Sequence, residues 1–195
     1  IKDVLNTGTL GIGFVGGSNA MYALFNEDHG NSEVAYNTLY RTIKMMEEAV
    51  ENLKKEYNLN FSVLATPAES LAGRFCKIDR KEFGLIPNVT DRDYYINSFH
   101  IDVKEKIGIF DKIKKEAQFH ALTRGGHITY VELDGEAKKN VSVILKIVKA
   151  MKDNQIGYGS INHPVDKCKD CGTEMIINDE CPICGSHNIS KIRRI

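Results

Sequence analysis

Two cysteine pairs near the end of the sequence constrain its fold more than any other feature. Cys168 and Cys171 form one C-x2-C pair, and Cys181 and Cys184 form a second after nine intervening residues. A glycine directly follows each pair, which lets the backbone turn so that both thiolates of a pair face one point. Four thiolates at this spacing predict one closed tetrahedral zinc site. Such a site leaves no coordination position for water, so the metal is expected to be structural rather than catalytic.

The spacing alone leaves two other uses of these cysteines open, namely two disulfides or an iron–sulfur centre. The 195-residue sequence contains no run of about 18 apolar residues and no secretory signal pattern, so we expect a cytoplasmic protein with no membrane partner. Thiols stay reduced in that compartment, which favours a metal over disulfides.

The overall charge of the sequence gives no reason to expect a nucleic-acid partner. Lys and Arg total 26 and are balanced by 26 Asp and Glu, while 42% of the residues are hydrophobic. This composition fits one core with a small appendage. The cysteine pairs still leave one binding function open, a zinc-ribbon module that binds nucleic acid or a protein partner. Lys191, Arg193 and Arg194 would supply its positive charges. Its weakness is that the cysteine knuckles carry no aromatic residue for base stacking.

Short apolar strands alternate with amphipathic helices over most of the sequence. Strands are expected at 9–15, 61–65, 127–133 and 156–161, and long helices at 32–57 and 140–152. The first strand is Gly-rich and is expected to be buried, with Ser18 as the N-cap of the short helix after it. Pro67 is expected in the first turn of another helix. Strands separated by helices predict an α/β fold with mainly parallel strands.

The Gly-rich segment 8–17 does not predict a nucleotide site. No G-x-G-x-x-G lies between its strand and a helix with an acidic residue about 20 positions on, and no G-K-[ST] occurs. Small residues that let neighbouring backbones approach each other within a barrel explain the glycines instead.

The turn Thr66-Pro67-Ala68-Glu69-Ser70 is a better candidate, because it lies between an apolar strand and a helix. A helix N-terminus presents unpaired amides that suit a phosphate, and Thr66 and Ser70 add hydroxyls. A plain helix cap with Glu69 in the first turn is the alternative. Polar segments at 97–100, 120–127 and 158–163 also lie at or beside expected strand ends, where parallel α/β folds meet ligands. Each single histidine there is more often structural than catalytic.

Several segments, taken in order, resemble one known family. They are 9–16 (TLGIGFVG), 64–75 (LATPAESLAGRF), 127–133 (HITYVEL) and 157–166 (GYGSINHPVD), followed by the four cysteines. Together they closely resemble the C-terminal part of anaerobic (class III) ribonucleoside-triphosphate reductases, over nearly the whole sequence. The resemblance implies a glycyl radical enzyme that converts ribonucleoside triphosphates to deoxyribonucleoside triphosphates. It also implies the C-terminal portion of a ten-stranded α/β barrel at residues 1–163 and a small zinc-binding domain with four cysteine ligands at 164–195.

The resemblance further implies roles for individual residues. Thr66, Ala68 and Ser70 fall in a turn that resembles the loop holding the substrate phosphates, and Glu69 resembles a glutamate near the ribose that transfers a proton. The zinc ligands of the family are matched by Cys168, Cys171, Cys181 and Cys184. Implied cofactors and partners are structural Zn²⁺, a glycyl radical, formate or a thiol reductant, a radical-SAM activating enzyme, and a second copy of the parent protein in a homodimer.

The sequence departs from the family pattern at both of its ends. The radical glycine of the family lies just beyond a stretch like Arg193-Arg194-Ile195, and the thiyl cysteine belongs to a segment upstream of Ile1. Cys76 matches neither position, and the N-terminal regulatory part of the family has no counterpart in residues 1–195. We therefore expect this chain alone to be inactive and the parent protein to carry both radical residues elsewhere.

Overall fold

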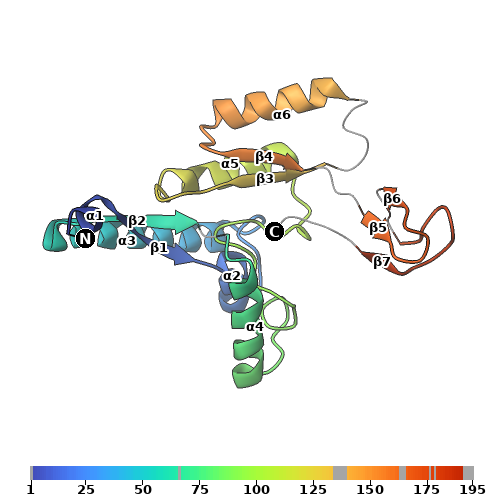
Figure 1. Cartoon of the computed structure of the whole chain (residues 1–195), viewed down its shortest axis with the longest axis horizontal. Coiled ribbons are helices and arrows are strands. Elements are labelled where there is room, and N and C mark those ends of the chain that lie inside the picture. The colour runs from blue at the N-terminus through green and yellow to red at the C-terminus, as the bar shows by residue number, and fades with distance from the viewer. Residues whose placement is uncertain are drawn as a thin grey trace.

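The chain forms an α/β part followed by a small β module, as Figure 1 shows. The structure is a computed structural model that describes residues 2–65, 67–133, 140–162, 166–175, 177 and 179–190. Within these residues the elements follow in the order α1 (Lys2–Thr7), β1 (Thr9–Phe14), α2 (Gly17–Phe25), α3 (Glu33–Tyr57), β2 (Asn60–Ala65), α4 (Ser70–Phe83), α5 (Ile109–His120), β3 (Thr129–Glu132), α6 (Val141–Asp153), β4 (Gly159–Asn162), β5 (Asp166–Cys168), β6 (Glu174–Met175) and β7 (Ile189–Ser190).

The strands of the α/β part are parallel, as predicted. β1 pairs with β2, and β3 pairs with β4. A parallel bridge between Leu64 and Gly126 joins the end of β2 to the segment that enters β3. There the Ala65 N–H donates to the Gly126 carbonyl at 2.9 Å. The α/β part therefore contains two parallel strand pairs linked by this single bridge, with helices in every connection between strands, as in parallel α/β folds.

The expectation that the first strand is buried was wrong for this chain. Every residue of β1 except Phe14 is exposed, and Leu10 keeps 50% of its surface accessible. The reason is that β1 pairs with β2 alone among the described residues, so its other edge and one face meet solvent. A Cβ atom at Gly11 would meet Leu64 only at an ordinary contact distance of 3.7 Å, so this glycine serves no close packing within the described part of the chain.

Two helix starts also differ from the sequence-based expectation. Ser18 is not an N-cap: α2 is capped by Gly16, which has a left-handed φ of 83°, and the buried Ser18 hydroxyl donates to Asp28 instead. Pro67 is not in the first turn of a helix, because α4 begins three residues later, at Ser70. The Ala68 N–H donates to the Asn97 side chain at 2.9 Å, which holds this segment as a turn ahead of the helix.

The other long helices match the expected ranges. α3 begins after Ser32, whose hydroxyl accepts from the Ala35 N–H at 3.4 Å, and α6 begins after Asn140, which caps it in the same way. α5 was not predicted, because the buried Glu116 interrupts its apolar face. α5 contributes side chains to two hydrophobic cores. It packs with α3 and β2 in one core and with β3, β4 and α6 in the other. No helix in the described ranges is both long and apolar enough to cross a membrane.

Buried histidines make the stability of this core sensitive to acid. Burial lowers the pKa of His100 and of His120 to about 4, from 6.5, and lowers that of His29 as well. The unfolded chain therefore binds more protons than the folded chain between about pH 6.5 and 4. The contribution of these neutral histidines to the free energy of unfolding is fully present above pH 6.5. It is expected to fall on acidification, by up to about 1.4 kcal/mol per pH unit for each such histidine. Urea unfolding of the chain at pH 7.5 and 5.0 measures this, and equal midpoints would contradict it.

Candidate active-site turn and metal centre

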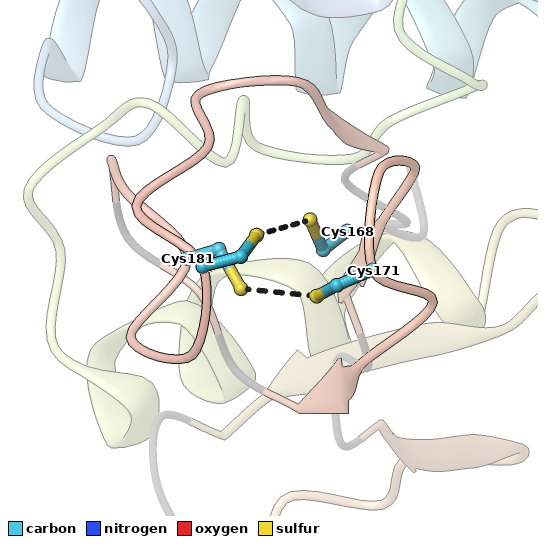
Figure 2. Close-up of side chains that lie close together, drawn as sticks. Cys168, Cys171 and Cys181 are labelled. Atoms are coloured by element: carbon cyan, nitrogen blue, oxygen red, sulfur yellow. Dashed lines mark hydrogen bonds between the residues drawn. The ribbon is translucent and has the colours of Figure 1, made fainter.

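The four paired cysteines meet in one cluster in the β5–β7 module. Their sulfur atoms all lie within 4.8 Å of one another. The sulfur of Cys168 is 3.6 Å from that of Cys184, and the sulfur of Cys171 is 3.6 Å from that of Cys181, as the close-up in Figure 2 shows for the labelled residues. Each close contact thus joins one pair to the other, so the two pairs form a single site.

The local sequence explains why each pair presents its sulfurs in this way. In the first knuckle the Gly172 N–H donates to the Cys168 carbonyl at 2.9 Å, and in the second the Gly185 N–H donates to the Cys181 carbonyl at 2.8 Å. Both glycines have left-handed φ angles, 74° and 70°, which a residue with a side chain rarely adopts. The predicted role of these glycines is therefore confirmed, and the two knuckles share one turn geometry.

The cluster fits a tetrahedral metal ion. A metal–sulfur distance of about 2.3 Å places neighbouring sulfurs about 3.8 Å apart, close to the observed 3.6 Å. A disulfide requires about 2.05 Å, and all four cysteines are free. The cluster can therefore hold a metal ion with four protein ligands and no open position.

Asp170 connects the two knuckles through its carboxylate, a role that the sequence did not reveal. It lies between Cys168 and Cys171, accepts from the Ser186 hydroxyl at 2.5 Å, and accepts from the Asn188 side chain at 3.0 Å. Ser186 and Asn188 follow the second cysteine pair. A carboxylate that bonds across the cluster can orient both cysteine pairs around a bound metal.

We expect Asp170→Ala to raise the rate at which a chelator removes the metal by about 10- to 100-fold, because both bonds across the cluster are lost. Asp170→Asn should have a smaller effect, since an amide oxygen still accepts from Asn188. Glu174→Ala is the matched control: it removes an exposed ion pair to Lys167 in the same module, and such pairs are worth little. Metal release followed with a coloured chelator measures all three, and equal rates for Asp170→Ala and Glu174→Ala would refute the role of Asp170.

The candidate substrate turn lies at the carboxyl end of β2, where α4 begins. Ala68 is buried, whereas Glu69 and Ser70 are exposed, and Thr66 lies outside the described residues. The Ala68 N–H is held by Asn97, so this amide does not face solvent as a free donor. Asn97 belongs to a polar segment at a strand end that the sequence singled out, although nothing in the sequence connected it to Ala68.

Glu69 has the most unusual backbone in this turn. Its φ of 43° and ψ of −116° lie outside the regions that residues with side chains prefer. It occupies the N-cap position of α4, yet its side chain makes no capping hydrogen bond. The plain-cap alternative for Glu69 is therefore not what the structure shows. A strained residue with an exposed carboxylate at a strand end is typical of functional sites.

The other polar residues singled out in the sequence are mostly structural. Each ring of the neighbouring histidines His120 and His127 has a hydrogen-bond partner: Thr129 and the Gly157 N–H for His120, and the Thr123 carbonyl for His127. Cys76 is fully buried in α4, and its thiol donates to the Arg92 carbonyl at 2.9 Å. His163 lies outside the described residues.

The family model that matches this chain and the relatives that are similar to it carry the same protein name. The family model for "Anaerobic ribonucleoside-triphosphate reductase" matches residues 1–195. The protein of that name from Escherichia coli (strain K12) is 33% identical over 98% of this chain and 28% of its own length. The one from Enterobacteria phage T4 is 43% identical over 69% of this chain and 23% of its own length. The chain thus spans less than a third of these relatives.

Solved structures agree on the fold. An anaerobic ribonucleotide reductase superposes with a TM-score of 0.71 at 24% identity, over 98% of this chain and 30% of that one. The anaerobic ribonucleotide reductase from Thermotoga maritima with dATP bound in its specificity site gives 0.66 at 21% identity, over 96% of this chain and 31% of that one. Because the family model matches all of residues 1–195, this chain belongs to the anaerobic ribonucleoside-triphosphate reductases.

Proposed function

We propose that the whole protein reduces ribonucleoside triphosphates to deoxyribonucleoside triphosphates by glycyl and thiyl radical chemistry. This chain would supply the substrate turn and a structural zinc module. The radical glycine and the thiyl cysteine would lie in parts of the protein outside residues 1–195. With formate as reductant the reaction balances as ribonucleotide, formate and a proton giving deoxyribonucleotide, carbon dioxide and water. A thiol reductant would supply the same two electrons.

The observation that carries this proposal is the strained Glu69 at the carboxyl end of a parallel strand. Parallel α/β sheets bind substrates at this edge, and we infer that the exposed carboxylate exchanges a proton with a bound sugar. The Ser70 hydroxyl and the start of α4 lie beside it and suit a phosphate. The two parallel strand pairs, with helices in every connection and one bridge between them, support a place for this part of the chain in the wall of a ten-stranded barrel.

The four-cysteine cluster supports zinc as the metal and a structural role for it. Four thiolates saturate a tetrahedral ion, so the metal would fix the path of the chain and take no part in the reaction. We propose a homodimeric, cytoplasmic parent enzyme activated by a radical-SAM enzyme, as the family resemblance implies. A zinc ribbon for nucleic acid is less well supported, because Asp170 and Glu174 place carboxylates beside the cysteine pairs.

The test is to incubate the whole protein, activated without oxygen, with the four ribonucleoside triphosphates and formate. Deoxyribonucleoside triphosphates should form. Ser70→Ala should raise KM by an amount equivalent to about 1–3 kcal/mol of lost phosphate contact, with little change in kcat. Ser142→Ala, an exposed serine on α6, serves as the control. Absence of deoxyribonucleotide product in the wild-type protein would reject the proposed function.

A further inference from the structure

Asn97 connects the carboxyl ends of the two paired strands β1 and β2. Val15, which directly follows β1, forms an antiparallel bridge with Asn97. The side chain of Asn97 accepts from the N–H of Ala68, in the turn after β2, at 2.9 Å. Asn97 belongs to neither strand, yet it links both of them at the edge where parallel α/β sheets bind substrates.

The first turn of α2 holds the backbone on both sides of Asn97. The Asn19 side chain accepts from the Ile96 N–H at 2.7 Å, and the Gly17 N–H donates to the Ser98 carbonyl at 3.0 Å. A Cβ atom at Gly17 would lie 2.5 Å from the Ser98 carbonyl oxygen, so this close approach requires glycine. The position of Asn97 is therefore fixed by contacts that do not involve the substrate turn.

The hydrogen bond between Asn97 and Ala68 joins two strained stretches of backbone. Ser98, which directly follows Asn97, is fully buried and has a left-handed φ of 41°. Glu69, which directly follows Ala68, has a left-handed φ of 43°. Residues with side chains keep such angles only where the surrounding contacts hold them, and they occur preferentially at functional sites. The bond therefore lies next to the candidate proton-transfer carboxylate and belongs to the contacts that maintain its backbone.

The helix α4 has a separate contact to the rest of the chain. The Ala72 carbonyl in its first turn accepts from the Tyr95 N–H at 3.3 Å. Ser70 is the first residue of this helix and is held with it, whereas Glu69 precedes the helix. The backbone group that is fixed directly before Glu69 is the N–H of Ala68. Loss of the bond to this N–H should therefore move Glu69 more than Ser70.

We propose that Asn97 is a positioning residue for the reductase reaction, and that its bond to Ala68 holds the carboxylate of Glu69 in the orientation that proton transfer needs. The inference rests on the proposed function and deepens it. Asn97 acts through the backbone of the turn and does not have to contact the substrate. Because a misplacement of about 1 Å can cost about a hundredfold in rate, the loss of this one bond should be far more visible in turnover than in stability.

The test is a double-mutant cycle in the whole enzyme, activated without oxygen. Asn97→Ala should lower kcat by about 10- to 100-fold and change the affinity for substrate by less than about threefold. In the Glu69→Gln protein the same change should have almost no further effect on kcat, because the carboxylate that Asn97 positions is already absent. If Asn97 served the fold alone, the two losses would multiply.

A second measurement reports on the hydrogen bond itself. Hydrogen exchange of the peptide that contains Ala68 should be slow in the wild type and fast in Asn97→Ala. Asn97→Asp keeps an oxygen acceptor in the same place, so it should retain slow exchange and most of the wild-type rate. Asn154→Ala is the matched control: it removes an asparagine bond of the same length, 2.9 Å to the Ala150 carbonyl on α6, and should change neither measurement.

The outcomes separate this proposal from the one on which it rests. If Glu69→Gln lowers kcat but Asn97→Ala turns over at the wild-type rate, or if the two losses multiply, the positioning role is wrong and the proposed function stands. If Glu69→Gln itself turns over at the wild-type rate, the role of Glu69 fails and the positioning role fails with it. Should Asn97→Ala not fold, Asn97→Gln decides in its place, since the longer side chain keeps the amide but moves the acceptor oxygen, and it should show the same loss of kcat.

Discussion

Replacing Cys181 by serine in the whole enzyme is expected to remove its zinc and to abolish formation of the glycyl radical. Cys181 is 1% exposed, and its sulfur lies 3.6 Å from that of Cys171, so no other side chain can take its place in the cluster. A structural zinc site contributes about 10–16 kcal/mol to the folding of a small domain. Without it, the β5–β7 module should loosen while the α/β part stays folded. The radical loop would then lose its position, and an error of about 1 Å can cost about a hundredfold in rate.

Cys76→Ser is the matched control for this experiment. Cys76 is equally buried but lies in α4, and a serine hydroxyl can donate to the Arg92 carbonyl as the thiol does. Metal analysis should give about one zinc per chain for the wild type and for Cys76→Ser, and almost none for Cys181→Ser. Full zinc content in Cys181→Ser, or two intact disulfides in the wild type by mass spectrometry, would contradict the assignment of the cluster.

Glu69→Gln is expected to lower kcat by about 10²- to 10⁴-fold while substrate binding changes little. The amide keeps the shape of the side chain but cannot exchange a proton with the ribose. Because the backbone strain at Glu69 is the same for glutamine, the turn itself should persist. Single-turnover measurements of product formation, together with equilibrium binding of substrate, distinguish loss of chemistry from loss of binding.

Glu82→Gln is the control for that change, since Glu82 is an exposed glutamate at the other end of the same helix. It should turn over at the wild-type rate. A wild-type rate in Glu69→Gln would remove Glu69 from the reaction, and a parallel loss of substrate binding would assign it to binding instead.

The four-cysteine cluster could be predicted from the sequence, because the geometry of each cysteine pair is local. Each C-x2-C-G segment forms a turn in which the glycine N–H donates to the carbonyl of the first cysteine, so the spacing predicted how each pair presents its sulfurs. Asp170 could not be found in this way. Its partners Ser186 and Asn188 are brought to it only when the two knuckles pack together.

The α/β part was predictable where periodicity was strong and local. α3, α6 and the parallel strands follow from apolar spacing and caps. α5 was missed because Glu116 sits on its buried face, where Lys112 pairs with it and Ile101 donates to it. The start of α4 was misplaced because Asn97, distant in sequence, holds Ala68 in the turn. Glu69 directly follows Ala68, so the shape of the candidate site includes a contact between segments distant in sequence that a linear pattern does not show.

Spin quantitation by electron paramagnetic resonance tests whether the four-cysteine module positions the loop that carries the radical glycine. The whole protein, Glu69→Gln and Cys181→Ser would each be treated with the activating enzyme under anaerobic conditions. A glycyl signal of normal intensity is expected in the wild type and in Glu69→Gln, because the proposed substrate turn acts after the radical is formed. No signal is expected in Cys181→Ser, because loss of the metal would release the loop that carries the radical glycine. A glycyl signal of normal intensity in Cys181→Ser protein shown to lack zinc would show that the four-cysteine module does not position that loop.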